Sequence, residues 1–187
     1  MKISFIAGSG LKRLGITAVG ICLGTSLAFA GPEEDNALAE KEFARGDLVV
    51  SMGLWRKAAQ AGYAPSQVWL GDLLDKAEED VLAVEWYQKA ADQGSAGGEY
   101  GLGQMYLKGE GVKKDVELGR RYIERAATNN HVEAVKVMMD SYRQGGMGMA
   151  VDNAQADVWE AKLMVILPGY TKPVPKSTGK TPKGAPK

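Results

Sequence analysis

The sequence is poor in the residues that nucleophilic and metal chemistry require. Its 187 residues include one cysteine, Cys22, and one histidine, His131. Zinc sites use several cysteine or histidine ligands, which this chain does not supply. No serine stands in the Gly-x-Ser-x-Gly setting of a nucleophile elbow, and His131 follows two asparagines at a turn, where a capping or surface role is favoured. We therefore predict a protein that is not an enzyme and that uses no metal or cofactor.

Cysteine is missing altogether after residue 30. The first 30 residues have the features of an export signal: Lys12 and Arg13 end a basic segment, an apolar stretch too short for a comfortable membrane span follows, and residues 28–30 read Ala-Phe-Ala. We predict a signal peptide over 1–30 with cleavage after Ala30, and a periplasmic or secreted mature protein without disulfide bonds. The alternative is an uncleaved N-terminal anchor.

A net charge of zero conceals an acidic body and a basic end. Residues 31–170 hold 15 basic and 23 acidic side chains, whereas residues 171–187 hold five lysines and no acid. Because phosphate binding needs clustered Lys and Arg, the acidic body argues against a nucleic-acid partner. The Pro- and Lys-rich end has too few apolar residues to order itself, so we predict a disordered tail over 168–187.

A repeated segment is the strongest signal in the chain. The sequence WYQKAADQG at 86–94 has variants at 54–62, 122–130 and 158–165, and its basic residue recurs at Lys57, Lys89, Arg125 and Lys162 in steps of 32, 36 and 37. Steps of this length are typical of helical repeat arrays. The pattern predicts an all-α, right-handed solenoid of four antiparallel helix pairs over 31–167. Its units are expected at about 37–62, 64–94, 97–130 and 133–166.

Local signals indicate where the helices begin, end and pack. A first helix is predicted over 36–46, and Asp47, Asp115 and Asp152 are expected to cap later helices. Gly103 lies inside a helical pattern, which favours a close packing contact at that point. Pairs of adjacent alanines in three units are expected to let helices approach closely. The gaps between layers are predicted to be filled by four large residues: Trp55, Trp86, Tyr122 and Trp159.

Two segments carry a resemblance to a known family. LGQMYLKGEGVKKD with the following YIERAA, and WYQKAADQG, resemble the Sel-one-like repeat, a relative of the tetratricopeptide repeat. The resemblance covers about residues 37–166 and is weakest in the end units. It implies a shared architecture rather than one shared activity, and the expectation that such proteins organise complexes or regulate partners.

The resemblance also predicts a binding face. In the related tetratricopeptide fold, the first helix of each pair lines the concave side. The residues expected to point into that groove are Val68, Asp72, Asp75, Tyr100, Gln104, Leu107, Lys136, Asp140 and Arg143. Asp72 and Asp75 lie one helical turn apart and suit a cation, although a solvated face with nothing bound is the simpler interpretation.

The functional hypothesis is a non-catalytic scaffold or adaptor of the bacterial periplasm that binds a partner protein or peptide in this groove. The alternative is a tethering protein whose basic tail binds anionic lipid or cell-wall polymer in a salt-dependent manner.

Overall fold

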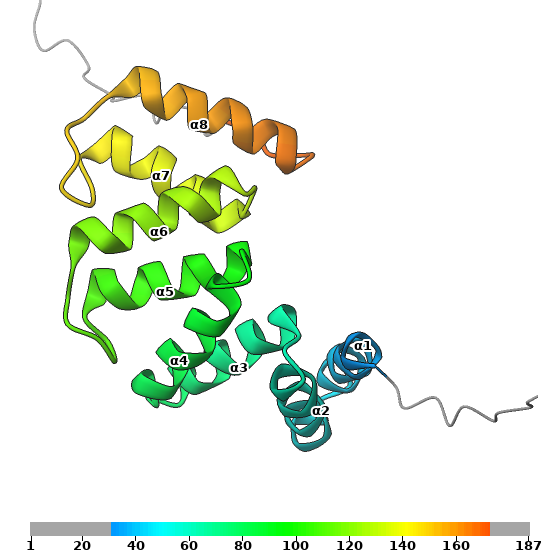
Figure 1. Ribbon diagram of the computed structural model, residues 1–187. Helices are drawn as coiled ribbons and strands as arrows, with labels where there is room; N and C mark the ends of the chain where they lie inside the picture. The colour runs from blue at the N-terminus through cyan, green and yellow to red at the C-terminus, as the bar shows by residue number, and fades with distance from the viewer. Residues whose placement is uncertain (1–30, 173–187) are drawn as a thin grey trace, which may run out of the picture.

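The computed structural model describes residues 31–172, and all regular structure in this range is helical (Figure 1). The predicted signal peptide, its cleavage site, Cys22 and residues 173–187 of the predicted tail lie outside the described residues. Within 31–172, no helix combines the length and the hydrophobicity needed to cross a membrane. The helices in this range are α1 (Pro32–Ala44), α2 (Leu48–Gln60), α3 (Ala64–Lys76), α4 (Asp80–Ala91), α5 (Ala96–Lys108), α6 (Val116–Thr128), α7 (Val132–Gln144) and α8 (Asn153–Ile166).

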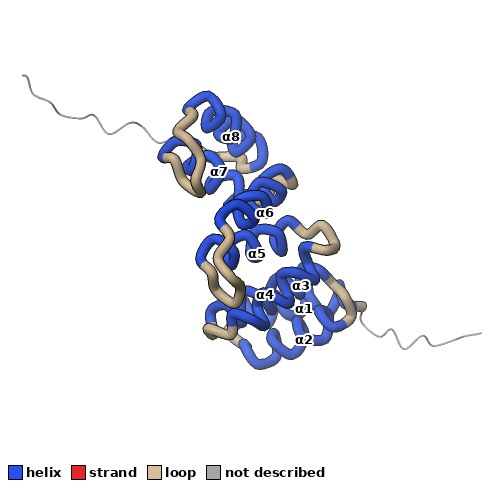
Figure 2. Tube along the Cα trace, turned by 60° about the vertical axis from the view of Figure 1, so that its left-hand side comes forward, coloured by secondary structure: helices blue, strands red, loops and turns tan. Residues whose placement is uncertain are grey.

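The helices form four hairpins, each packed on the next (Figure 2). The residues that precede the second helix of each pair are Asp47, Glu79, Asp115 and Asp152, which repeat in steps of 32, 36 and 37 residues. The predicted register is therefore confirmed. The three aspartates accept hydrogen bonds from the backbone N–H groups of Val50, Leu118 and Gln155, as their predicted capping role requires.

The first helix begins four residues earlier than predicted, at Pro32 rather than Asn36. Proline suits the first turn because its missing N–H would have no partner there. The three acidic residues that follow, Glu33, Glu34 and Asp35, lie in the same turn, where the helix dipole favours negative charge.

Small residues bring the helices together at the predicted places. All six alanines of the Ala-Ala pairs are at most 4% exposed: Ala58, Ala59, Ala90, Ala91, Ala126 and Ala127. A Cβ at Gly103 of α5 would lie 2.8 Å from the side chain of Ile123 in α6. Gly103 is therefore a packing contact, as predicted, and the absent side chain sets the distance between these helices.

The prediction for the large aromatic residues was partly wrong. Trp55 is completely buried, but Trp86, Tyr122 and Trp159 are only half-buried. By the repeat step, Trp55 is equivalent to Tyr87 and not to Trp86. Neighbouring positions on a helix point about 100° apart, so this shift of one residue turns Trp86 away from the core.

Each of the half-buried aromatic rings instead contacts a cationic side chain one turn further along the same helix. The charged groups of Lys89, Arg125 and Lys162 lie 3.9, 5.5 and 5.8 Å from the ring centroids of Trp86, Tyr122 and Trp159. Such contacts stabilise exposed helix surfaces weakly, by about 0.5–1 kcal/mol each. The basic residue that marks the repeat therefore covers an aromatic ring in three units, whereas Lys57 of the first unit pairs with Asp35 at 2.8 Å.

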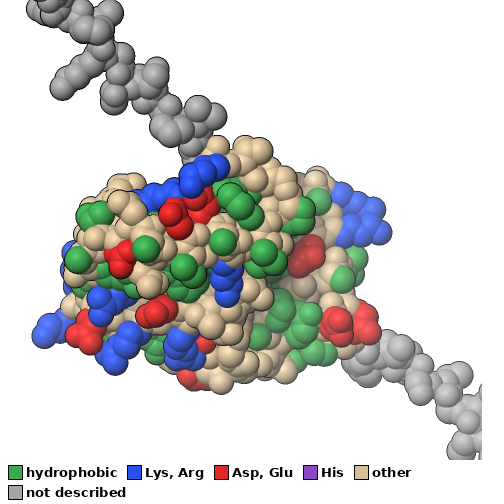
Figure 3. All heavy atoms as spheres, turned by 90° about the horizontal axis from the view of Figure 1, so that it is seen from above, with side chains coloured by type: hydrophobic (Ala, Val, Ile, Leu, Met, Phe, Trp, Pro, Cys, Tyr) green, Lys and Arg blue, Asp and Glu red, His purple; other side chains and the backbone are tan. Residues whose placement is uncertain are grey.

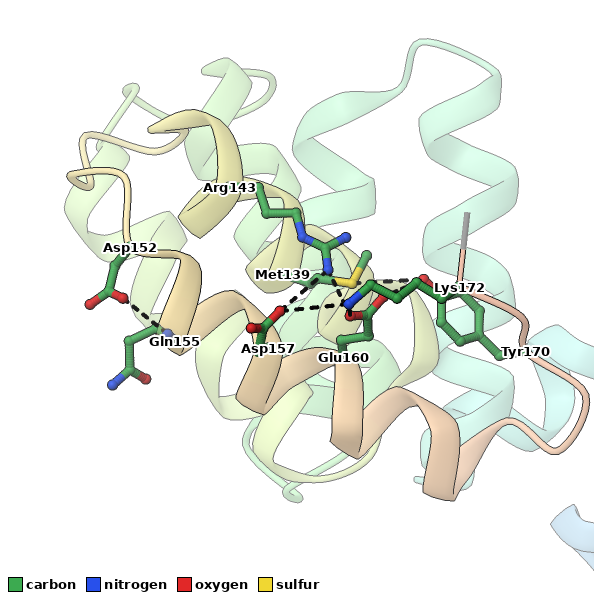
Figure 4. Close-up of polar contacts among 8 residues, drawn as sticks. All are labelled: Met139, Arg143, Asp152, Gln155, Asp157, Glu160, Tyr170 and Lys172. Carbon is green, nitrogen blue, oxygen red and sulfur yellow. Dashed lines mark hydrogen bonds and ion pairs between the residues drawn. The ribbon is translucent and has the colours of Figure 1, made fainter. Parts of the chain in front are cut away.

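At the end of the array, a carboxylate takes the position that the other units fill with a buried apolar or aromatic residue. Glu160 is equivalent to Trp55, Tyr87 and Ile123, and it is 2% exposed. It pairs with Arg143 of α7 at 2.8 Å and with Lys172 at 2.7 Å, while the hydroxyl of Tyr170 donates to it at 3.4 Å (Figure 4).

The segment after α8 belongs to the folded array. Tyr170 packs against the core cluster of the last two units, and Lys172 pairs with Glu160. These contacts place residues 168–172 on the array, whereas the sequence predicted that its end lay at 167 and that the tail began at 168. The tail prediction therefore remains only for residues 173–187.

Candidate binding site on the first-helix face

Tyr87 reaches from a second helix to the face that the first helices line. Its ring is 3% exposed and lies between α3 and α5. A Cβ at Gly71 of α3 would lie 2.5 Å from the ring, and one at Gly101 of α5 would be about as close. Only glycine leaves room for the ring on both sides, so these two positions let the hydroxyl emerge between the helices.

The hydroxyl of Tyr87 emerges in a cavity of about 300 Å³. There it donates a hydrogen bond of 2.8 Å to Asp72. The first helices of the second and third units supply most of the walls, because their stacking leaves a gap between polar side chains. The residues around this cavity, called the α3–α5 pocket below, are Asp72, Asp75, Tyr87, Tyr100, Gly101, Gln104, Met105 and Lys108.

The pocket holds negative charge in a partly buried place. Burial raises the pKa of the Asp72 carboxyl, and the hydrogen bond from Tyr87 offsets part of that increase. Burial and then the neighbouring charge of Asp72 raise the pKa of Tyr87 well above its usual range, so its hydroxyl remains a donor at neutral pH. No cation within residues 31–172 forms an ion pair with Asp72 or Asp75, and Lys108 at the rim pairs with Glu110 at 2.8 Å.

An aromatic pair stands beside the pocket. The rings of Tyr100 and His131 stack with centroids 4.5 Å apart and planes 21° from parallel. Nδ1 of His131 accepts a hydrogen bond from the backbone N–H of Ala134 at 3.3 Å, which confirms the capping role predicted for this histidine. Burial lowers the pKa of His131, and the neutral ring is the form whose Nδ1 accepts.

The structure brings together four of the nine residues predicted to line the groove. Asp72, Asp75, Tyr100 and Gln104 all border the α3–α5 pocket. They come from equivalent turns of α3 and α5, which lie side by side, so the four side chains share one face.

The other five predicted residues have different surroundings. The side chain of Val68 packs against Gly97 of α5, 3.3 Å from the position that a Cβ at Gly97 would occupy. Leu107 packs against Gly119 of α6. In α7, Lys136 pairs with Glu133, Arg143 pairs with Glu160, and Asp140 is exposed. These residues therefore do not contribute to the pocket.

Four residues of the pocket escaped the sequence analysis: Tyr87, Gly101, Met105 and Lys108. Tyr87 belongs to a second helix, which the resemblance placed away from the groove. The glycines at 71 and 101 were the available signal, because a large residue with glycine on both facing helices is free to pass between them.

The side chains of this site supply negative charge and hydrogen-bonding groups. Within residues 31–172, no three or more His, Cys, Asp or Glu side chains lie together as a metal site would require. A larger hollow of about 370 Å³ borders α6, but residues 121–129 of that one helix and its end supply all of its walls. The α3–α5 pocket is built by three helices and joins carboxylates, hydroxyls, an amide and an aromatic face. This combination suits a positively charged group with an apolar stem.

The fold and the pocket define a class of protein: an all-helical repeat array with a polar pocket on its first helices. The model of the Sel1 repeat family matches residues 45–63, 65–95 and 96–131. This part of the chain therefore consists of Sel1 repeats, and Sel1-repeat proteins are typically scaffolds for protein–protein interactions and generally non-catalytic. The predicted family and the predicted all-α repeat fold are confirmed.

Relatives share part of their length with this chain. An uncharacterized protein of Neisseria meningitidis serogroup B is 33% identical over 110 residues, which are 59% of this chain and 23% of that protein. A protective antigen of uropathogenic Escherichia coli with an SLR fold is 30% identical, with a TM-score of 0.62 over 72% of this chain and 30% of the other. The chain spans less than a quarter of the curated relatives it matches.

A solved Sel1 repeat protein from Oxalobacter formigenes shows the same fold at lower identity. It is 22% identical to this chain, with a TM-score of 0.64 over 72% of this chain and 58% of the other.

Proposed function

We propose that this protein is a non-catalytic scaffold of the bacterial periplasm, and that it holds a segment of a partner protein on the face lined by α3 and α5. The observation that carries the proposal is the Asp72 carboxylate. It lies partly buried beside Asp75, in a place that raises its pKa, and no cation of residues 31–172 pairs with it. A charge held in this way costs the folded protein stability, and such groups are concentrated at functional sites.

The chemistry of the pocket indicates which part of the partner enters it. An arginine or lysine side chain would neutralise Asp72 and Asp75 and pack its stem against Tyr100. Gln104 offers an amide that both donates and accepts, as a peptide backbone requires. We therefore assign the pocket to a basic side chain of an extended segment.

A photo-crosslinking experiment in the native cells tests this assignment. A photoreactive amino acid at Lys108 stands at the exposed rim of the pocket, and one at Glu124 stands in the larger hollow beside α6. The proposal predicts that the probe at 108 captures a discrete partner that the probe at 124 does not capture. Changing Asp72 and Asp75 to Asn should abolish the capture at 108.

A synthetic peptide from the captured segment provides the second half of the test. Replacing its basic residues with Gln should weaken binding to the purified protein by at least tenfold, which corresponds to about 1.4 kcal/mol. Equal capture by both probes, or capture that persists in the Asp72→Asn, Asp75→Asn variant, would contradict the assignment.

The periplasmic location is part of the proposal and rests on residues 1–30. Cell fractionation with N-terminal sequencing should find the protein in the periplasm with Gly31 as its first residue. Full-length protein in the membrane fraction would favour the uncleaved anchor instead.

A second candidate function, tethering to an anionic envelope surface, is favoured by the five lysines of residues 171–187. Removing residues 173–187 leaves Lys172 and its contact with Glu160 in place. Tethering predicts that this truncation abolishes co-sedimentation with anionic vesicles or cell wall at low salt, and that high salt does the same to the full chain. Equal sedimentation of both forms would exclude it.

A further inference from the structure

The outer surface of α8 is apolar at three positions where the other second helices carry glycine or polar residues. Three consecutive outward positions are apolar in α8, where they hold Val158, Ala161 and Val165. In the earlier helices the same repeat positions hold glycine or polar residues: Gly53, Arg56 and Gln60 in α2, Glu85, Gln88 and Asp92 in α4, and Arg121, Glu124 and Thr128 in α6.

These apolar side chains of α8 are open to solvent. Val158 is 61% exposed and Val165 is 79% exposed. Figure 3 views the molecule from the α8 end, and hydrophobic side chains lie open on this face among charged ones. A helix face that stays open to solvent is ordinarily polar, and the equivalent positions of α2, α4 and α6 hold polar residues or glycine. An apolar stripe at this place therefore indicates a surface that becomes covered.

The spacing of the stripe matches a helix–helix seam. With Ala154 at its start, the stripe follows intervals of four, three and four residues, which is the spacing of the a and d positions in a heptad. At about 100° per residue, the four side chains fall within roughly 60° of one another. Alternating alanine and valine let a second helix approach closely, whereas the stripe has none of the aromatic residues that anchor a helix in lipid.

Charges on either side of the stripe are complementary to those of an identical helix. Asp157 and Lys162 flank it on opposite edges, five residues apart, as g and e positions do. In a parallel pair of α8 helices, Asp157 of each copy would lie opposite Lys162 of the other. Asp157 is 66% exposed, with its nearest cations at 3.9 Å. Lys162 donates to the carbonyl of Thr128 at 2.8 Å, which leaves two of its N–H groups available.

We propose that α8 is a self-association surface, and that its occupant is α8 of a second copy of this chain, packed parallel to it across a two-fold axis along the seam. The self-complementary charges identify a second copy as the occupant, and the stripe of small and branched side chains favours a protein helix over a membrane. The dimer would carry two α3–α5 pockets, so a partner with repeated basic segments would bind it with higher avidity.

The size of the surface sets the expected affinity. A helix of 14 residues is roughly 21 Å long, and a seam of this length is smaller than a standard protein interface. We therefore expect a weak and reversible dimer, with a dissociation constant on the order of 100 μM.

Sedimentation equilibrium of the full chain, from roughly 10 μM to 1 mM, tests the proposal in the range where such a dimer forms. The decisive variant is V158R/V165T, which gives α8 the residues that α6 has at these positions, Arg121 and Thr128. Both valines are exposed, so the fold should be retained, and circular dichroism with thermal melting verifies it. The wild type should shift from monomer to dimer as its concentration rises, and the variant should remain a monomer throughout.

Two controls make the outcome specific to this face and orientation. Val81 of α4 is 62% exposed and lies outside the stripe, so Val81→Glu should dimerise like the wild type. Asp157→Lys and Lys162→Asp should each weaken the dimer, and together they should restore it. A wild type that stays monomeric at 1 mM, whatever else it binds, would overturn the proposal. So would a V158R/V165T variant that dimerises normally, or a double charge exchange without recovery.

Discussion

Tyr87 and Glu160 occupy the same position of the repeat and have opposite chemistry. Tyr87 lies between the first helix of its own unit and that of the next, and glycine on both sides accommodates its ring. Glu160 has α7 on one side and, where a further unit would begin, the segment with Tyr170 and Lys172. The position in the repeat determines the direction of the side chain. The element that follows the unit, a further first helix or the segment after α8, determines which side chain can be buried there.

The comparison also separates two electrostatic situations. Glu160 is surrounded by cations, and hydrogen bonds from Lys172 and Arg143 lower its pKa. Asp72, which receives the hydroxyl of Tyr87, has a raised pKa because burial opposes its ionised form. The first carboxylate therefore stabilises the end of the array, whereas the second leaves negative charge available in a pocket.

Truncating Tyr87 should give the largest effect of any change at this position. Tyr87→Ala leaves an unfilled space between α3 and α5, and the loss of a buried aromatic side chain costs about 3–5 kcal/mol. Urea denaturation followed by circular dichroism measures the free energy of unfolding. Tyr87→Phe keeps the ring and should lose less, and equal losses would mean that packing of the ring contributes little.

Adding a methyl group at Gly101 should have the next largest effect. Gly101→Ala forces Tyr87 out of its place, and overpacking of this kind costs about 1–3 kcal/mol. Gly53 is the matched control, because it lies in α2 with nothing within 4 Å of its missing Cβ. Gly53→Ala should stabilise the protein by up to about 1 kcal/mol. If both substitutions lowered the free energy of unfolding, or both raised it, the packing role assigned to Gly101 would be wrong.

Removing the charge of Glu160 should have a smaller and pH-dependent effect. A lowered pKa in the folded state gives stability that is present above the unfolded pKa and is lost as the pH falls through the folded value. Glu160→Gln should therefore cost about 1 kcal/mol at pH 7, and this cost should shrink as the pH falls through the folded pKa. Urea denaturation at neutral and at strongly acidic pH measures the difference, and a loss that is the same at both would exclude the ionic origin.

The architecture could be predicted from the sequence because it depends on spacing. Alanine pairs, capping aspartates and a basic residue recur at a fixed step, and each reports a local requirement of a helix or of its contact with a neighbour. The start of α1 was missed, although Pro32 and the acidic residues after it suit a first helical turn.

The site could be predicted only in part. The offsets in α3 and α5 led to Asp72, Asp75, Tyr100 and Gln104, because equivalent turns of adjacent first helices share a face. Tyr87 was missed because its place depends on the absence of side chains at two distant glycines. The burial of Glu160 depends on residues beyond α8, which the composition of the tail had assigned to disorder.

The smallest expected change in stability carries the most information about function. The raised pKa of Asp72 means that its protonated form favours folding, and that this stability is lost as the pH rises through the folded value. Asp72→Asn removes a partly buried charge and keeps an oxygen that accepts from Tyr87. At pH 7 it should leave the free energy of unfolding unchanged or raise it by less than about 1 kcal/mol.

Measuring the unfolding free energy and the partner capture of Asp72→Asn together tests the central claim most directly. The account predicts that stability is retained or increased while capture by the probe at Lys108 is lost, because the charge serves binding and not folding. A variant that is less stable and still captures the partner would contradict it.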